Sequence, residues 1–256
     1  MCELFGISAN KKILLNTALK EFFSHSEEHP HGWGMAILDN NISIEKEPEK
    51  ASRSKYLKYR LEVPVNSSRL FAHIRKATIG ELNFNNCHPF VKSDDSGRKW
   101  TLVHNGTIFN SEILAEYQSL QEGNTDSERV LLYIIDKINE KLKENNGCLE
   151  NEVRIEFVEK LIKKLAKGNK LNLLIYDEEY MYVHKNQEGT LYLKNNEDYT
   201  MFSTRPLDSD TWKDVPINRL MVYKDGKNIY TGKKHNHTYV FDEEHYKFLF
   251  VHYSTL

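Results

Sequence analysis

The sequence has few cysteines and no long apolar run, and each shortage argues against a class of protein. Its three cysteines, Cys2, Cys87 and Cys148, are an odd number and form no Cys-x-x-Cys pair. We therefore expect free thiols rather than a disulfide framework or a structural zinc site. No apolar run approaches the about 18 residues that span a bilayer. We expect a protein without a membrane span.

The sequence also lacks an excess of charge of either sign. Its 35 basic and 37 acidic residues are interspersed and give a formal net charge of −2, which offers no electrostatic footprint for nucleic acid or an anionic membrane. Charged residues from Glu3 onward interrupt any signal-like apolar stretch, so we expect a cytoplasmic protein. One cluster of lysines is interpreted as the solvent-exposed face of a helix: Lys163, Lys164, Lys167 and Lys170.

A chain of 256 residues without repeats, low-complexity tracts or long linkers predicts a single domain over residues 1–256. Apolar spacing predicts helices at 11–24, 52–62, 126–143 and 152–167, the third opened by a capping box of Thr125 and Glu128. Strands are predicted at 2–9, 34–39, 42–47, 69–78, 101–108, 171–177, 180–184, 190–194, 199–203, 219–224, 228–231, 239–241 and 248–252. This order predicts a mixed chain in which sheets pack together and helices cover them.

Cys2 directly follows the initiator methionine. Methionine is normally removed before a small side chain, and removal would leave a thiol and a free α-amine on one residue. An α-amine titrates near about 7.7–8.0, so part of it is unprotonated at neutral pH and can accept the proton of the thiol. The alternative is an ordinary cysteine at the start of a strand.

Two further stretches could serve this thiol. The glycines around Trp33 in His31-Gly32-Trp33-Gly34 allow close backbone approach and could form a wall behind a nucleophile, or simply a hairpin entry with a core tryptophan. Arg75 ends a predicted strand and offers a planar fork that suits a carboxylate. Its alternative is a surface arginine on an edge strand.

Asn105 and Gly106 supply a side-chain amide and a backbone N–H that could converge on one oxygen as an oxyanion hole, or could form a common Asn-Gly turn. Asp126 lies in the first turn of a helix, which the helix dipole already favours, and it could also bind a substrate ammonium. His88, which follows Cys87, is interpreted as pocket structure.

A metal site is a weaker alternative. His25, His29 and His31 with Glu28 carry suitable ligands, but their spacing matches no standard site. We expect no metal and no cofactor.

Together these residues are the parts needed to hold free glutamine. They resemble the class II glutamine amidotransferases of the N-terminal nucleophile hydrolase superfamily, and the similarity covers about the first half of the chain. It lies in Cys2, His31-Gly32-Trp33-Gly34, Ala72-His73-Ile74-Arg75, Asn86-Cys87-His88-Pro89-Phe90, His104-Asn105-Gly106 and Thr125-Asp126-Ser127-Glu128.

The resemblance implies an α+β fold, a four-layer αββα sandwich with the nucleophile at the start of a central strand. It implies that Cys2 is the nucleophile and that Asn105 and Gly106 hold the oxyanion. The implied substrate-binding residues are Arg75 and Asp126 as glutamine clamps, with Thr78, His88, Gly32 and Trp33 around the pocket.

One departure concerns the stretch after Arg75. Many members of the family have Arg-Trp-Ala-Thr-His-Gly where this chain has Arg75-Lys76-Ala77-Thr78-Ile79-Gly80, so an aromatic wall and a histidine are missing. The chain looks closer to the stand-alone branch of the family, and Ser203-Thr204-Arg205-Pro206-Leu207 is similar to a Ser-x-Pro-Leu-type stretch there.

The expected activity is hydrolysis of glutamine. The alternatives are hydrolysis of another γ-glutamyl amide and a non-catalytic subunit that senses glutamine. The second half of the chain shows no glycine-rich phosphate loop or dinucleotide fingerprint, so transfer of ammonia would require a separate acceptor-domain protein.

Overall fold

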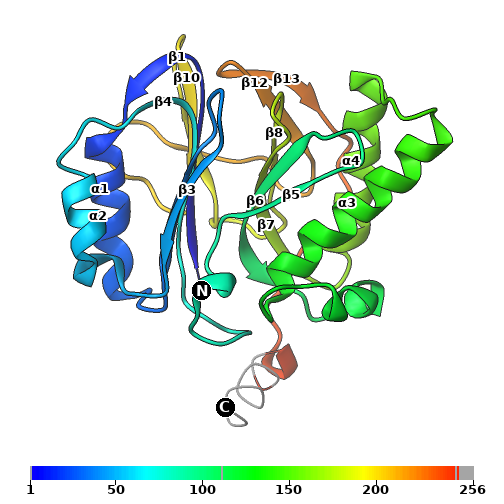
Figure 1. The fold of residues 1–256 in the computed structure, drawn as a ribbon, viewed down its shortest axis with the longest axis horizontal. Coiled ribbons are helices and arrows are strands. Elements are labelled where there is room, and N and C mark those ends of the chain that lie inside the picture. Colours follow the sequence, from blue (N-terminus) through cyan, green and yellow to red (C-terminus); the bar gives the residue numbers. More distant parts are fainter. Residues whose placement is uncertain (1, 111, 246, 248–256) are drawn as a thin grey trace.

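Two β-sheets pack face to face and helices cover both outer faces, which gives four layers in the order αββα (Figure 1). The computed structural model describes residues 2–110, 112–245 and 247. The helices are α1 Asn16–Ser24, α2 Lys55–Arg60, α3 Asp126–Glu144 and α4 Asn151–Ala166. Helices α1 and α2 cover one sheet, and α3 and α4 cover the other. This arrangement confirms the α+β sandwich.

Within the described residues, the first sheet has the strand order β11-β9-β10-β1-β4-β2-β3 and the second has the order β13-β12-β8-β7-β6-β5. All of the paired strands are antiparallel. Their bounds are β1 Glu3–Leu14, β2 Trp33–Ile37, β3 Ser43–Glu47, β4 Asn66–Ile74, β5 Phe90–Ser93, β6 Lys99–Thr107, β7 Lys170–Tyr176, β8 Met181–His184, β9 Tyr192–Asn195, β10 Tyr199–Ser203, β11 Lys213–Asp214, β12 Met221–Lys224 and β13 Lys227–Thr231.

The first strand is longer than the sequence predicts. β1 continues to Leu14, which pairs with Asn66 of β4, and α1 begins only at Asn16. The prediction of a helix over residues 11–15 is therefore wrong. Pairing with β4 overrides the helical spacing and leaves Leu14 61% exposed, while Leu19 and Phe22 of the helix are buried.

Other boundaries also differ from prediction. β4 ends at Ile74, so residues 75–78 form a loop instead of the end of a strand. Strands β5 and β11 are absent from the prediction, residues 239–241 form no strand, and the strand predicted at 248–252 lies outside the described residues. Thr125 caps α3 by accepting the N–H of Glu128 at 3.2 Å. The Glu128 carboxylate, however, accepts the N–H groups of Glu122 and Gly123, so only half of the capping box forms.

Three apolar clusters fill the spaces between the four layers. One packs sheet β1-β4-β2 against α1 and α2, and another packs sheet β6-β7-β8 against α3 and α4. The third lies between the sheets and joins Leu4 and Phe71 to Val103 and Leu174. Because side chains alternate along a strand, membership of these clusters tells which face of each strand looks into the inter-sheet layer.

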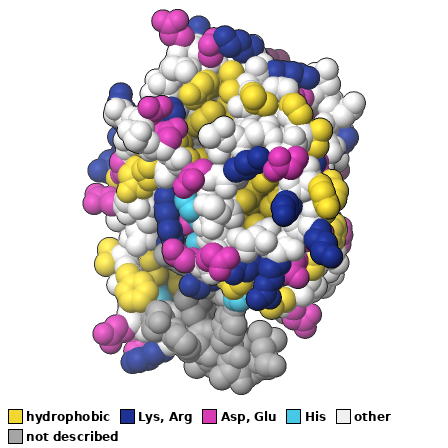
Figure 2. Space-filling view, turned by 90° about the vertical axis from the view of Figure 1, so that its left-hand side faces the viewer, with side chains coloured by type: hydrophobic (Ala, Val, Ile, Leu, Met, Phe, Trp, Pro, Cys, Tyr) yellow, Lys and Arg dark blue, Asp and Glu magenta, His cyan; other side chains and the backbone are white. Residues whose placement is uncertain are grey.

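The surface over α1 and α2 mixes the two signs of charge. Figure 2 shows lysine and arginine side chains interspersed with aspartate and glutamate on this side of the molecule. Within the described part of the chain, no helix is both long and apolar enough to cross a membrane.

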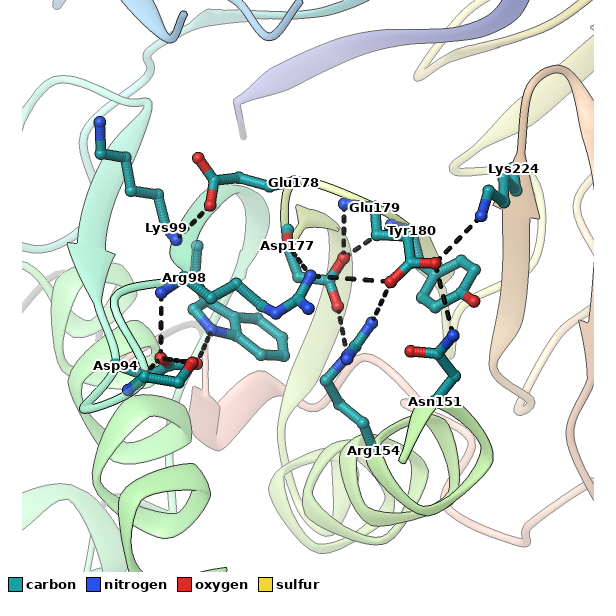
Figure 3. Close-up of polar contacts among 12 residues, drawn as sticks. Asp94, Arg98, Lys99, Asn151, Arg154, Asp177, Glu178, Glu179, Tyr180 and Lys224 are labelled. Atoms are coloured by element: carbon teal, nitrogen blue, oxygen red, sulfur yellow. Dashed lines mark hydrogen bonds and ion pairs between the residues drawn. The ribbon is translucent and has the colours of Figure 1, made fainter. Parts of the chain in front are cut away.

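A network of paired charges ties α4 to the turn between β7 and β8 (Figure 3). Arg154 of α4 donates through Nε to Asp177 at 2.8 Å and through Nη2 to Glu179 at 2.8 Å. Asp177 also accepts the hydroxyl of Tyr182 at 2.8 Å, and Lys224 donates to Glu179 at 3.0 Å. Each buried charge therefore has an opposite charge and hydrogen bonds, as burial requires.

Candidate active site

Cys2 lies immediately before β1 and faces the inter-sheet layer. Leu4 belongs to the cluster between the sheets, and a Cβ at Gly6 would lie 2.5 Å from Leu174 of the second sheet. Side chains alternate along a strand, so residue 2 points to the same face as residues 4 and 6. Its thiol is held by the backbone of Lys76, whose N–H donates to Sγ at 3.4 Å and whose carbonyl accepts from Sγ at 3.5 Å.

The environment of the thiol resists ionisation. Burial raises the pKa of Cys2 above its usual range. The hydrogen bond from Lys76 and the charge of Arg75 lower this pKa, and the charge of Asp126 raises it. Arg75 and Asp126 therefore lie close enough to Cys2 for their charges to act on its pKa. The three residues come from the start of β1, the end of β4 and the start of α3.

Arg75 is buried and anchors the loop that follows β4. Its Nη2 donates to the carbonyls of Ile79 and Gly80 at 3.0 and 2.9 Å, and its Nη1 donates to the carbonyl of Glu81 at 2.8 Å. A guanidinium has five N–H groups. Three of them form these bonds, so the loop orients the guanidinium. The other two N–H groups, one on Nε and one on Nη1, are not used by the loop.

Asn105 lies on β6, on the strand face that carries Val103 into the inter-sheet layer. Its side chain is buried, and its Oδ1 has no hydrogen-bond partner among the described residues. At Gly106, a Cβ would lie 2.0 Å from the carbonyl oxygen of Lys170. Only glycine allows this close approach of β6 to β7.

Asp126 is the first residue of α3 and is buried. Its Oδ2 accepts the backbone N–H of Ile108 at 2.8 Å, which fixes the carboxylate directly after β6. Thr78 is half-buried, with its Oγ1 3.5 Å from that of Thr107. The carboxylate and Thr78 therefore border the same end of β6 as Asn105.

His88 is buried against β4. Its ring stacks on His73 of β4 with centroids 3.9 Å apart, and neither ring nitrogen has a hydrogen-bond partner within the described part of the chain. Burial lowers the pKa of His88 well below its usual value and that of His73 to about 3. Both rings are therefore neutral at physiological pH.

Trp33 is not brought together with Cys2. Its side chain belongs to the cluster under α1 and α2 and donates through Nε1 to Glu47 at 3.0 Å, so it lies on the opposite face of the sheet from Cys2. The structure thus agrees with the alternative that the sequence left open, a core tryptophan at the entry of a hairpin. Gly32 has φ +136°, and a Cβ there would lie 2.7 Å from Sγ of Cys87. This residue contributes backbone alone.

The other two thiols differ from Cys2. Cys87 is buried, and its Sγ donates to the carbonyls of Glu47 and Asn83 at 3.4 Å. Burial raises the pKa of Cys87 to about 11. Cys148 is exposed.

Two of the histidines considered as metal ligands, His25 and His29, lie beside Glu3 of the strand that follows Cys2, whereas His31 accepts the N–H of Ala77. Nδ1 of His25 lies 2.8 Å from Oε2 of Glu3, and Nε of Arg205 lies 2.7 Å from Oε1 of the same buried carboxylate. Among the residues that the structure describes, no group of three or more His, Cys, Asp or Glu side chains could hold a metal ion. This cluster instead fixes the residue that follows Cys2.

Sequence reasoning missed Lys170. The interpretation of this residue as part of a solvent-exposed helix face is wrong, because Lys170 begins β7 and is 1% exposed. Burial lowers the pKa of its amine to about 8, and the charge of Cys2 acts in the opposite direction. The alternation of polar and apolar residues in Lys170-Leu171-Asn172-Leu173 was the available signal, since it marks a strand with one polar face.

Comparisons with known proteins point to one family. The model of the family "Glutamine amidotransferases class-II" matches residues 1–195. An uncharacterized protein of Methanocaldococcus jannaschii is 31% identical over 265 residues, which cover 91% of this chain and 72% of that protein. YafJ of Escherichia coli, provisionally named a glutamine amidotransferase, is 30% identical over 191 residues, which cover 71% of each.

A solved structure shares the fold. The glutamine phosphoribosylpyrophosphate amidotransferase of B. subtilis superposes with a TM-score of 0.64 at 17% identity, over 91% of this chain and 49% of that one. That likeness shows that the two chains share a sandwich fold. The family match over most of the chain decides the assignment: this protein belongs to the class II glutamine amidotransferase family.

Proposed function

We propose that this protein hydrolyses the side-chain amide of glutamine, with Cys2 as the nucleophile after removal of Met1. The observation that carries the proposal is the neighbourhood of the Cys2 thiol. The thiol faces the inter-sheet layer. The charge of Arg75 lowers the pKa of the thiol and the charge of Asp126 raises it. Free glutamine carries a carboxylate, an ammonium and a carboxamide, which these three residues complement.

The proposed reaction begins with proton transfer from the thiol of Cys2 to its own α-amine. The thiolate attacks the amide carbon, and the tetrahedral oxygen is held by the side-chain amide of Asn105 and the backbone N–H of Gly106. The α-ammonium returns its proton to the departing nitrogen, which leaves as ammonia. Water then hydrolyses the thioester, which releases glutamate and restores the thiol.

Arg75 would bind the α-carboxylate of glutamine and Asp126 its α-ammonium. Two donors of Arg75 are left after its bonds to the loop, and the loop bonds orient the guanidinium before substrate arrives. This preorganisation reduces the cost of ordering on binding.

A larger γ-glutamyl amide is a second candidate substrate, favoured by one observation. Lys76, at the position where many family members have tryptophan, is exposed, so no aromatic side chain closes that side of the pocket. A pocket open there would accept a bulkier group on the amide nitrogen. The ratio of kcat/KM for glutamine to that for a γ-glutamyl anilide separates the two candidates.

Isotope tracing tests the proposed function. With amide-¹⁵N glutamine and the purified chain alone, we expect label to appear as free ammonia, together with one glutamate per ammonia. Label in an added co-substrate would contradict the stand-alone hydrolase. Binding of glutamine without any turnover by protein that begins at Cys2 would favour the glutamine-sensing alternative.

A further inference from the structure

A buried lysine lies across the inter-sheet layer from Cys2. Along β7, Leu171 and Leu173 pack toward the helices, and Leu174 packs between the sheets. Lys170 and Asn172 therefore share the inter-sheet face with Leu174. The side chain of Cys2, at the start of β1, points toward this face from the other sheet.

The backbone of Lys170 also packs closely against the strand that carries Asn105 and Gly106. Lys170 pairs with Thr107 in the β6–β7 ladder. Its carbonyl oxygen lies 3.3 Å from Nε2 of His104, directly beside the space that a Cβ at Gly106 would occupy. Lys170 thus begins β7 opposite Thr107, one residue beyond Gly106 and two beyond Asn105 along β6.

The pKa values of Cys2 and Lys170 are displaced in opposite directions. The surroundings of the thiol raise its pKa, and burial of the lysine lowers the amine pKa to about 8. A thiolate beside an ammonium relieves both effects at once, because each charge stabilises the charged form of the other group. An amine with a pKa of about 8 is still mostly protonated at neutral pH.

We propose that Lys170 is a positioning residue whose ammonium group stabilises the thiolate of Cys2 during attack on the substrate amide. This inference rests on the proposed role of Cys2 as nucleophile. Lys170 keeps its proton throughout the cycle, while the α-amine of Cys2 accepts the thiol proton and returns it to the leaving ammonia. Lysine thus supplies charge and the α-amine supplies proton transfer.

Other charged or titratable groups also surround the thiol, and the test must separate them from Lys170. Arg75 lowers the pKa of Cys2 and Asp126 raises it. Further groups with electrostatic or hydrogen-bonding links to this set are His31, His73, His88, His104, Lys76 and Cys87. A substitution at Lys170 removes none of these side chains. Burial lowers the pKa of His104 and the charge of Lys170 lowers it further, so the test compares Lys170→Met with Lys170→Arg, which keeps that charge.

The test is the pH dependence of alkylation at Cys2 by iodoacetamide, followed on the N-terminal peptide by mass spectrometry. The thiolate is the reacting form, so the rate reports its population without any need for glutamine turnover. In Lys170→Met we expect the alkylation profile to move to higher pH and the rate at neutral pH to fall about tenfold or more. The exposed Cys148 serves as an internal reference thiol in the same samples.

Lys167→Met is the matched control, because it removes an exposed charge of the same sign three positions away. It should leave the Cys2 profile unchanged. Lys170→Arg should restore most of the rate, since arginine keeps the charge and cannot act as a base. An unchanged profile in Lys170→Met, or a loss in Lys170→Arg as deep as in Lys170→Met, would overturn the proposal.

A reciprocal measurement covers the case in which Lys170→Met fails to fold. The amine of Lys170 can be titrated by NMR in protein with ¹⁵N-labelled lysine, before and after Cys2→Ala. We expect the pKa of Lys170 to fall further when the thiolate is removed, because the Cys2 charge raises it. An unchanged pKa would contradict the pairing. Because neither experiment uses glutamine, failure of this proposal is distinguishable from failure of the proposed hydrolase activity.

Discussion

The two ends of β7 hold buried charges in opposite ways. At the end next to Asp177, the carboxylate is paired with Arg154 (Figure 3). It also accepts the hydroxyl of Tyr182. Burial alone would raise the pKa of the neighbouring Glu179, but hydrogen bonds from Lys224 and Arg154 outweigh it and lower that pKa to about 2. Here the protein favours the charged forms.

At the opposite end, the environment opposes charge. Burial lowers the pKa of Lys170 and raises that of Cys2. Groups whose titration is displaced in this direction within a site are candidates for chemistry, whereas fully satisfied ion pairs hold the fold. The comparison therefore predicts that substitutions at the Asp177 end change stability and that substitutions near Cys2 change turnover.

The largest effect is expected for Cys2→Ala. It should reduce glutamine hydrolysis to the background rate while the melting temperature stays near that of the unmodified protein, because alanine removes only the thiol. Steady-state ammonia release and thermal unfolding check this. Cys148→Ala, at an exposed thiol, is the control and should be fully active; substantial turnover by Cys2→Ala would place the nucleophile elsewhere.

Arg154→Met should destabilise the protein by about 3–5 kcal/mol, because it leaves the buried Asp177 carboxylate without its cation. Denaturant unfolding measures the loss. The kcat of the folded fraction should be unchanged. Lys141→Met, at a partly exposed surface pair with Glu144, is the comparison and should cost less than about 1 kcal/mol. Equal losses in the two variants would remove the distinction between the buried network and the surface.

Asn105→Ala should lower kcat on the order of 10²–10³-fold with little change in KM, because the amide acts where charge develops in the transition state. Steady-state kinetics at saturating and limiting glutamine separates the two parameters. An effect confined to KM would instead make Asn105 a ground-state contact.

Arg75→Lys should raise KM for glutamine about tenfold or more, since an ammonium cannot reproduce the bonds of the guanidinium to the loop carbonyls and also bind the substrate carboxylate, as proposed for Arg75. Isothermal titration in the Cys2→Ala background measures affinity without turnover. A Kd equal to that of Cys2→Ala alone would exclude Arg75 from substrate binding.

The sequence predicted much of the site because short motifs carry it. Motifs named Cys2, Arg75, Asn105 and Asp126 as candidates. The structure places Cys2 and Asn105 on the inter-sheet faces of their strands, with Arg75 after β4 and Asp126 at the start of α3. The four-layer sandwich followed from the resemblance to the family. In each case, local residue types at fixed spacing define the chemistry.

What the sequence could not predict depends on contacts between distant segments. β1 runs through Leu14 because β4 pairs with it, and Trp33 faces the helices because of strand register. Lys170 follows a lysine-rich helix, and only its pairing with β6 shows that it turns inward. A buried lysine is uncommon, so composition alone favoured the surface interpretation.

The most direct test of the central claim is mass analysis of the N-terminal peptide from active protein, taken before and after a rapid acid quench in the presence of glutamine. Our account predicts that the peptide begins at Cys2 and gains a γ-glutamyl group as a thioester on that residue. A fully active protein that retains Met1, or a γ-glutamyl group found on Cys87 instead, would contradict it.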